Sequence, residues 1–586
     1  MFSYRALRRA HFKSNALIAI GGVLILFAAL VSNGGIERAL IADPSHTLSW
    51  GPALFRALLF IHGAALVFAG VNRRRTGRDH HVNQGPKAAH PSNQHKGAMP
   101  WLVLGGLSVL GLGLRLWHLN SGLWFDEVLT LLDFVRPPLG QIVTTFPSQN
   151  QHMLYSVLAH VSVSLFGESA WALRLPSVVF GVASIWALFL LGRRVSGSLI
   201  ALLACALMTV SYHHIWFSQN ARGYMGLMFF SLLATWLWLE AMERDEWRWW
   251  ISYAAALALG TWIHLTMAFV AGSHGLLLLL TLMRRKTAQG ESERRDAKGG
   301  SWWKPLAAYL LFGTLVLQFY ALALPEFLAR ALHEESLQSE WTNPIWVITE
   351  SVRSLRIGFS GLAVVLAAAT ITFVGWLAIL RKERIAGLAM VLPAVLAGSA
   401  MLLLGHNLWP RFFFFSMGFG LLIVVHGAMD LPKLLLTGIK PLERWRPFGQ
   451  RAGVATACLL ILASVLTVPR CYALPKQDFA GARDFVELNR REGDAVVAVG
   501  LAGRAYGSYF AREWLVAQTQ QELDAIRRRH SDTWLVYTIP VQVRAYCPGI
   551  WQEVERDFRV VRIFAGTLGG GEVYVCQLKS PSGGQS

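Results

Sequence analysis

The sequence predicts a polytopic α-helical membrane protein with thirteen membrane spans and a small C-terminal α/β domain outside the membrane. Of the 586 residues, 54% are hydrophobic and only 15% are charged, and the mean hydropathy is +0.41, which is typical of membrane proteins. Apolar runs of spanning length recur up to about residue 470, where the composition becomes that of a soluble domain. The net charge of +19 lies mainly in short basic clusters beside the apolar runs, such as 73–78 and 381–384.

These basic clusters indicate the topology. Lys and Arg beside spans stay on the cytoplasmic side, so we expect a cytoplasmic N-terminus and an extracytoplasmic C-terminal domain in a bacterial-type inner (plasma) membrane. No basic stripe with regularly spaced aromatic residues is present, so nucleic acid is not an expected partner. Residues 1–32 resemble a signal sequence but show no small-x-small cleavage site, which favours an uncleaved first helix.

The chain divides into four expected regions. Residues 1–72 form a transmembrane hairpin, 73–100 a basic cytoplasmic linker, 101–470 the transmembrane core and 471–586 the extracytoplasmic domain. The first outer loop covers 118–170. Its segment 153–166 is too short for a span, and we expect a helix that lies along the membrane surface. The thirteen expected spans are 16–31, 52–71, 101–116, 171–191, 199–216, 224–241, 250–263, 265–282, 306–322, 358–380, 385–404, 412–429 and 454–468.

The region after residue 470 has the patterns of an α/β domain. Apolar periodicity predicts two helices, two strands and a β-hairpin around a glycine turn, over 478–491, 519–530, 495–499, 534–537 and 559–578. No C-x-x-C pair indicates a zinc site. In an oxidising compartment one disulfide becomes feasible, and Cys547 with Cys576 is the pair we favour.

Two adjacent carboxylates, Asp126 and Glu127, follow the apolar run 101–116 at the membrane surface. With Trp124 and Phe125 beside it, a carboxylate held there can take a proton from an acceptor molecule. The other reactant would arrive attached to a lipid. The alternative is that the two acids cap a surface helix.

Four further segments fall on the same face as Asp126 in this topology: 213–224, 262–264, 325–356 and 405–411. They carry histidine and arginine. Polar residues near a bilayer are costly, so their convergence with a carboxylate predicts a functional site.

Five blocks in this order carry a family resemblance across residues 100–430. They are Leu123-Trp124-Phe125-Asp126-Glu127, then 172–177 with Phe180-Gly181, then 214–224, Thr261-Trp262-Ile263-His264 and Pro410-Arg411-Phe412. The sequence resembles the polyprenyl-phosphate-sugar-dependent glycosyltransferases of the GT-C fold, similar to bacterial relatives of protein O-mannosyltransferases and of the aminoarabinose transferase.

The resemblance implies a catalytic role for Asp126 as the base. Glu127 is a second candidate, which would orient Asp126 or a substrate hydroxyl. It also implies a lipid-linked sugar donor that enters from the bilayer, with its phosphate held by arginines. Guanidinium is a bidentate partner for phosphate, so Arg222 and Arg411 are the candidates. We expect the acceptor to be a lipid, a glycan or a protein, and we expect transfer to proceed with inversion. We also expect the loop 325–356 to close over the site.

Five further residues are candidates for the site. His264 matches a family position as a phosphate or metal contact, but histidine at an interface is commonly a satisfied polar residue. His152, Asn220 and Tyr224 are candidates for substrate binding. Arg174 is another, although an arginine at a helix end is commonly a snorkelling anchor.

The chain departs from the family pattern at two places. Gln151-His152-Met153 stands where relatives have His-Pro-Pro, and Asn220 stands where relatives have an acid before Ala-Arg-Gly-Tyr. If that acid binds a metal in relatives, metal dependence is in doubt here. We therefore assign no metal ligands, although a divalent ion stays possible.

Two other protein classes fit parts of the pattern. A transporter or flippase of a lipid-linked saccharide shares a lipid-facing basic site, but we see no internal repeat and no charged pair in the middle of a span. A non-catalytic membrane scaffold is the other alternative.

Overall fold

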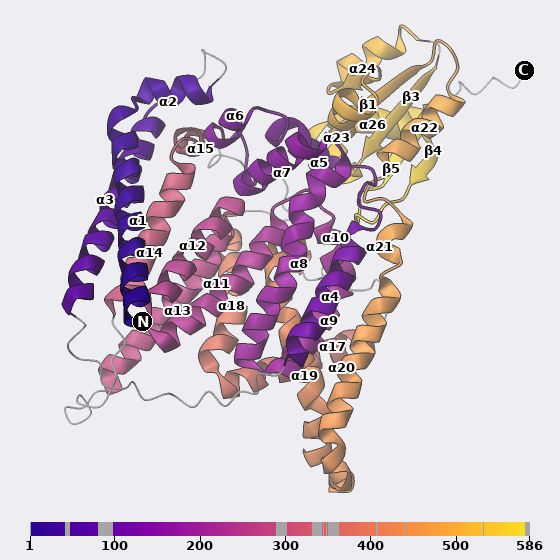
Figure 1. Ribbon diagram of the computed structural model, residues 1–586. Helices are drawn as coiled ribbons and strands as arrows, with labels where there is room; N and C mark the ends of the chain where they lie inside the picture. Colours follow the sequence, from indigo (N-terminus) through magenta and orange to yellow (C-terminus); the bar gives the residue numbers. More distant parts are fainter. Residues whose placement is uncertain are drawn as a thin grey trace, which may run out of the picture.

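The computed structural model describes residues 2–41, 47–79, 98–288, 302–330, 343, 345, 346, 349, 362–405, 408–438, 440–530 and 532–579. A bundle of long helices carries an α/β domain at one end (Figure 1). The long helices are α1 (Phe2–Leu30), α3 (Gly51–Asp79), α4 (Met99–Leu116), α8 (Ala170–Val195), α9 (Ser198–Thr209), α11 (Tyr224–Arg244), α12 (Trp247–Ile263), α13 (Met267–Ala288), α14 (Trp303–Tyr320), α17 (Leu362–Lys382), α18 (Arg384–Leu403), α19 (Met417–Gly438) and α20 (Gly449–Thr467).

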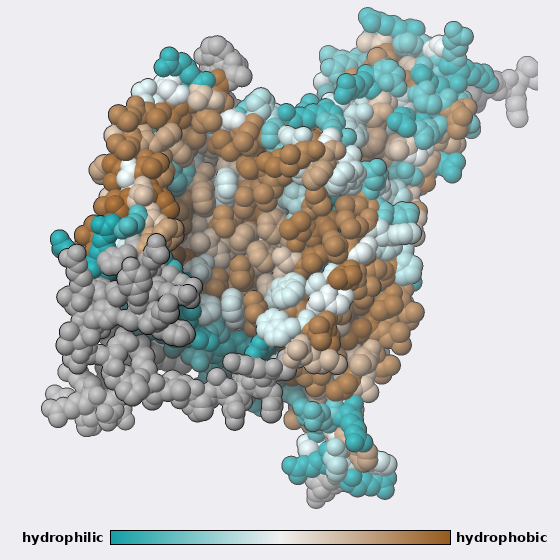
Figure 2. Space-filling view, viewed as in Figure 1, coloured by the Kyte–Doolittle hydropathy of each residue, from teal (hydrophilic) through white to brown (hydrophobic). Residues whose placement is uncertain are grey.

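The protein is a multi-pass membrane protein, but the expected count of thirteen spans needs correction. Among the described residues, nine helices are long and apolar enough to cross a membrane, or ten if α9 and α10 (Tyr212–Ser218), bent by 63°, form one span. The other three expected spans exist as helices α12, α13 and α14, which are not among these candidates. Figure 2 shows a broad hydrophobic band over the bundle and a hydrophilic surface on the α/β domain.

The N-terminal helices α1 and α3 pack closely against each other at the edge of the bundle (Figure 1). A Cβ added at Gly63 would lie 2.7 Å from the carbonyl oxygen of Gly21, so glycine allows this approach. Helix α3 extends to Asp79, beyond the expected end of the hairpin at 72. The remainder of the expected linker, with His80, His81, His90 and His95, lies outside the described residues.

Short helices cover the end of the bundle that carries the α/β domain (Figure 1). They are α2 (Asn33–Leu40), α5 (Phe125–Phe134), α6 (Leu139–Thr144), α7 (Met153–Phe166), α15 (Leu324–Arg330) and α21 (Arg470–Ala473). Helix α7 has the predicted bounds and packs against α8 and α12. Two 3-10 segments, η3 (Pro410–Ser416) and η4 (Lys440–Phe448), flank α19. Most of the loop 325–356, expected to close over the site, lies outside the described residues.

The C-terminal domain is a mixed five-stranded sheet with strand order β2-β1-β3-β5-β4. Strand β1 pairs in parallel with β2 and β3, whereas β5 pairs antiparallel with β3 and β4. The strands are β1 (Ala495–Val499), β2 (Leu515–Ala517), β3 (Thr533–Thr538), β4 (Phe558–Phe564) and β5 (Val573–Leu578), and the helical segments are α22 (Phe479–Asn489), α23 (Leu501–Ala505), η5 (Tyr506–Phe510), α24 (Gln520–Arg527), α25 (Pro540–Tyr546) and α26 (Pro548–Asp557).

Alternating strand residues build one apolar core on each face of this sheet. Val496 and Ala498 belong to one core, and Val497 and Val499 belong to the other. Both predicted helices, both predicted strands and the hairpin are present, whereas β2, α23, η5, α25 and α26 were not predicted.

The favoured disulfide is not formed. All five cysteines are free thiols, and Cys547 and Cys576 are buried in the same apolar core of the domain.

Candidate functional site

Helix α5 begins at the motif that carries the two acids. Trp124 is its N-cap residue, and the Trp124 N–H donates a hydrogen bond of 3.3 Å to Glu127 Oε2. Glu127 therefore does cap the helix, as the simpler interpretation proposed. The Asp126 carboxylate instead points away from the cap and pairs with Arg411.

Glu127 forms a fully buried ion pair with Arg174 of α8; both side chains have an exposed fraction of 0%. Arg174 Nε and Nη2 donate to Glu127 Oε1 and Oε2 at 2.8 and 2.5 Å, and the Ala221 N–H donates to Oε1 at 2.8 Å. Burial raises the pKa of Glu127, but the charges of Arg174 and Lys476 and their hydrogen bonds outweigh it and hold the pKa below its ordinary value.

Arg174 also fixes the loop that leads into α5. Its Nη1 donates to the carbonyl oxygens of Leu119 and Ser121 at 2.7 and 2.8 Å, and its Nη2 donates to that of Gly122 at 3.0 Å. The interpretation of Arg174 as a snorkelling anchor is therefore wrong. These contacts occupy and bury both side chains, and through them Glu127 and Arg174 fix the loop and the first turn of α5.

Asp126 and Arg411 pair at 3.1 Å between Oδ2 and Nη1. Their side chains have exposed fractions of 13% and 29%, so this pair is accessible where the Glu127 pair is not. Arg411 lies in η3, with its guanidinium carbon 5.1 Å from the centre of the Trp409 ring.

Arg222 lies in the loop before α11 and is almost completely buried. It donates to Thr130 Oγ1 at 3.4 Å and to Asn150 Oδ1 at 3.1 Å. Within the described part of the chain, Nε of Arg222 and Nε of Arg411 are both buried and have no hydrogen-bond partner. Two unpaired guanidinium N–H groups are available for an anion.

His152 and His264 lie beside these arginines, with ring centres 4.6 Å apart. Tyr224 packs against both rings. Burial, together with the positive charges of Arg222 and Arg411, lowers the pKa of His264 to about 3 and that of His152 well below its ordinary value. Both imidazoles are therefore neutral near pH 7.

The backbone sets the proton positions of both histidines. The Gly223 N–H donates to His152 Nδ1 at 2.7 Å, and the Thr266 N–H donates to His264 Nδ1 at 3.3 Å. A neutral imidazole whose Nδ1 accepts carries its proton on Nε2. Each ring can therefore donate one hydrogen bond from Nε2.

Asn220 and His214 lie apart from this group. Asn220 is buried, and its Oδ1 accepts a hydrogen bond from Trp124 Nε1 at 3.1 Å. Its role in substrate binding stays a prediction. His214 is buried against Arg115, with 2.6 Å between Nδ1 and Nη2. Arg115 also donates to the Thr209 carbonyl oxygen and to Ser218 Oγ, each at 3.2 Å, and so links α4 to α9 and α10.

The segment after α21 joins the soluble domain to the site, which the sequence did not indicate. Lys476 Nζ donates to the Gln219 carbonyl oxygen and lies 3.6 Å from Glu127 Oε1. Burial and the charge of Arg174 lower the pKa of Lys476 to about 7, against the opposing effect of Glu127.

Gln477 connects the residue before Asp126 to the C-terminal sheet. Its Oε1 accepts from the Phe125 N–H at 2.9 Å, while its Nε2 donates to Thr538 Oγ1 and to the Gly571 carbonyl oxygen, each at 3.1 Å. Phe125 itself packs into a core of the soluble domain. Both domains therefore hold the first turn of α5.

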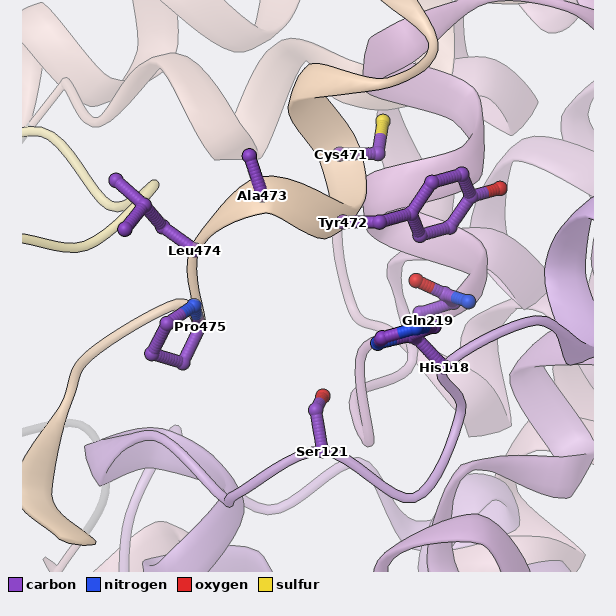
Figure 3. Close-up of a pocket in the computed structure, with 8 residues that line it drawn as sticks. All are labelled: His118, Ser121, Gln219, Cys471, Tyr472, Ala473, Leu474 and Pro475. Atoms are coloured by element: carbon purple, nitrogen blue, oxygen red, sulfur yellow. The ribbon is translucent and has the colours of Figure 1, made fainter. Parts of the chain in front are cut away.

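A small cavity of about 160 Å³ lies beside this junction (Figure 3). Gln219 and Tyr472 lie on its wall together with His118, Ser121 and the segment 473–475. None of the arginines or histidines near Asp126 lines it. Among the described residues, no group of three or more His, Cys, Asp or Glu side chains is arranged to hold a metal ion.

Fold and site thus define a multi-pass membrane protein with an arginine-rich polar site at one end of its helices. Residues 151–290 match the family model described as dolichyl-phosphate-mannose-protein mannosyltransferase. This match confirms the resemblance to membrane glycosyltransferases of the GT-C class over the part of the chain that contains Arg174, Arg222 and His264. No curated protein matches the chain.

Several solved structures are similar to the chain. ArnT from Cupriavidus metallidurans in the apo state has 13% sequence identity and a TM-score of 0.47, with 82% of this chain and 98% of that chain covered. The structure of the same protein bound to undecaprenyl phosphate has 13% sequence identity and a TM-score of 0.46, with 82% of this chain and 98% of that chain covered. Arabinosyltransferase EmbB from Mycobacterium smegmatis has 14% identity and a TM-score of 0.41, with 74% of this chain and 46% of that chain covered.

Proposed function

We propose that the protein is a membrane glycosyltransferase that moves a sugar from a polyprenyl phosphate donor to an acceptor at the extracytoplasmic face, with inversion. The observation that carries the proposal is the grouping of Asp126 with Arg222 and Arg411, two guanidinium groups that each keep a buried Nε–H without a partner. The family match over 151–290 supports it.

The donor phosphate binds between the two arginines. Each guanidinium offers a free Nε–H, and the neutral rings of His152 and His264 offer Nε2–H. Donors that are already fixed in place stabilise negative charge on the leaving phosphate without reorganisation. Arg411 contacts Asp126 through Nη1, so its Nε–H stays available for the phosphate.

Asp126 is the general base. Its carboxylate accepts the proton of the acceptor nucleophile as the nucleophile bonds to the anomeric carbon. The bond between that carbon and the phosphate oxygen breaks, and polyprenyl phosphate leaves with the electron pair. A single displacement from the opposite face inverts the anomeric configuration.

The test is transfer by purified, reconstituted protein supplied with radiolabelled polyprenyl phosphate sugars and envelope acceptor fractions. We expect Asp126→Asn to abolish transfer while the protein stays folded. Asp133→Asn is the matched control, since Asp133 lies on the same helix but pairs with the exposed Arg504 at 2.6 Å. If Asp126→Asn retains turnover, Asp126 is not the general base. If the protein translocates the lipid without transferring the sugar, it is not a glycosyltransferase.

The acceptor class is tested separately, because a lipid, a glycan and a protein leave different products. Deleting the gene and comparing the masses of envelope lipids, glycans and proteins identifies which of the three loses a sugar. If none of them changes in mass, the proposed acceptor classes are wrong.

A further inference from the structure

A second cavity lies between α13, α17 and α18, away from the proposed site. Its volume is about 340 Å³, which is within the range of small-ligand sites. Its wall is mostly leucine, with two arginines and a threonine: Leu277, Leu280, Thr281, Leu377, Leu380, Arg381, Arg384, Ile385 and Leu388.

The two arginines carry unbalanced positive charge. In the described ranges, neither Arg381 nor Arg384 forms an ion pair. Glu383, which stands between them in the chain, pairs instead with Arg194 of α8 at 2.6 Å, and Glu243 pairs with the same arginine at 2.6 Å. Glu383 and Glu243 are therefore both engaged by Arg194. Among the described residues, the cavity has two arginines without an ion pair beside an apolar wall.

The cavity is far from the site at Asp126. Helix α18 begins at Arg384 and runs for 20 residues toward the segment that carries Arg411. That length corresponds to about 30 Å, roughly the hydrocarbon thickness of a bilayer. The arginines thus lie at the opposite end of the bundle, where lipid headgroups of the other leaflet lie.

We propose that this cavity binds one anionic phospholipid of the membrane. Arg381 and Arg384 hold its phosphate by charge-assisted hydrogen bonds, and an acyl chain runs along Leu277, Leu280 and Leu377. The combination of an apolar wall with two arginines that lack an ion pair among the described residues fits a lipid phosphate better than a soluble anion. A soluble anion has no apolar group to pack against the leucines. This proposal does not depend on the proposed function.

The test is native mass spectrometry of the delipidated protein in detergent, with dioleoyl phosphatidylglycerol or dioleoyl phosphatidylcholine added. We expect one tightly held phosphatidylglycerol and no equivalent binding of phosphatidylcholine. The double variant Arg381→Gln/Arg384→Gln weakens that binding at least about tenfold, because it removes both charge-assisted hydrogen bonds to the lipid phosphate. Leu377→Trp, which fills the cavity without changing charge, weakens it as well.

Arg444→Gln/Arg446→Gln is the matched control, because it removes two exposed charges in η4 and leaves the cavity intact. Equal phosphatidylglycerol binding by the Arg381/Arg384 variant and the wild type overturns the proposal. An equal loss of binding in the Arg444/Arg446 control and in the Arg381/Arg384 variant overturns it as well. If inorganic phosphate alone displaces the phosphatidylglycerol, the cavity is an anion site that needs no lipid, and the proposal is overturned. Preference for undecaprenyl phosphate over phosphatidylglycerol replaces the phospholipid with a carrier lipid, which also overturns the assignment.

Discussion

Asp126 and Arg411 are 285 positions apart in the sequence and pair at 3.1 Å. The pair joins the first turn of α5 to η3, so the proposed base and one of the proposed phosphate-binding arginines lie on separate elements of one site. Charge on either residue therefore affects the other, and four predictions follow from this geometry and from the contacts around it.

Arg411→Lys should lower kcat/KM for the polyprenyl phosphate donor by about tenfold to a hundredfold. Lysine keeps the charge but loses the planar fork that can contact Asp126 and phosphate together, and one charge-assisted hydrogen bond is worth about 1.5–3 kcal/mol. Steady-state kinetics measure the effect. Arg136→Lys serves as the control, because Arg136 pairs with Glu168 on the surface and should leave the rate unchanged.

Arg174→Met should destabilise the fold by about 3–5 kcal/mol, because it leaves Glu127 buried without its main partner. Thermal unfolding in detergent, followed by tryptophan fluorescence, reports the change. The double variant Glu127→Gln/Arg174→Met should lose less stability than the sum of the two single variants. Additive losses would show that the two side chains do not act as a pair.

Lys476→Met should remove a rise in stability between about pH 7 and pH 10. The folded-state pKa of Lys476 is lowered to about 7 from its ordinary 10.5, so in this window the unfolded chain binds more protons than the folded one. Stability of the wild type therefore increases with pH there. Comparing the unfolding temperatures of wild type and variant across the window isolates this residue, and parallel curves would contradict the assignment.

Gln477→Ala should speed hydrogen exchange at the Phe125 amide and lower kcat more than it changes KM. The variant removes the acceptor that holds this N–H to the soluble domain, next to the proposed base Asp126. Exchange measured by mass spectrometry on peptides covering α5 checks the first effect. Arg504→Ala cuts another contact between the two domains, at Asp133, and should leave the Phe125 amide protected.

Local patterns predicted many of the elements. Helix α7 has the expected bounds because its apolar run is short and bounded by polar residues, and strand β1 matches the prediction to the residue. The disulfide between Cys547 and Cys576 was wrong because apolar burial of free thiols leaves the same sequence pattern as a bridge.

Long-range pairing explains what the sequence did not reveal at the site. Arg174 has the sequence context of a helix-end anchor, and only the fold brings it to Glu127, 47 positions away. Asn220 is engaged by the Trp124 ring, which no spacing rule indicates. Lys476 and Gln477 stand in an ordinary linker, so their contacts with the turn that carries Asp126 arise from domain docking alone.

The contact of Phe125 with the soluble domain has a consequence for biosynthesis. Phe125 emerges early from the ribosome, whereas the partners that enclose it, such as Phe479 and Val575, are made hundreds of residues later. A truncated or unfinished chain therefore carries the arginines of the proposed site but lacks the contacts of Phe125 with the soluble domain. Under the proposed function, the nascent chain should gain transfer activity only after strand β5 is in place.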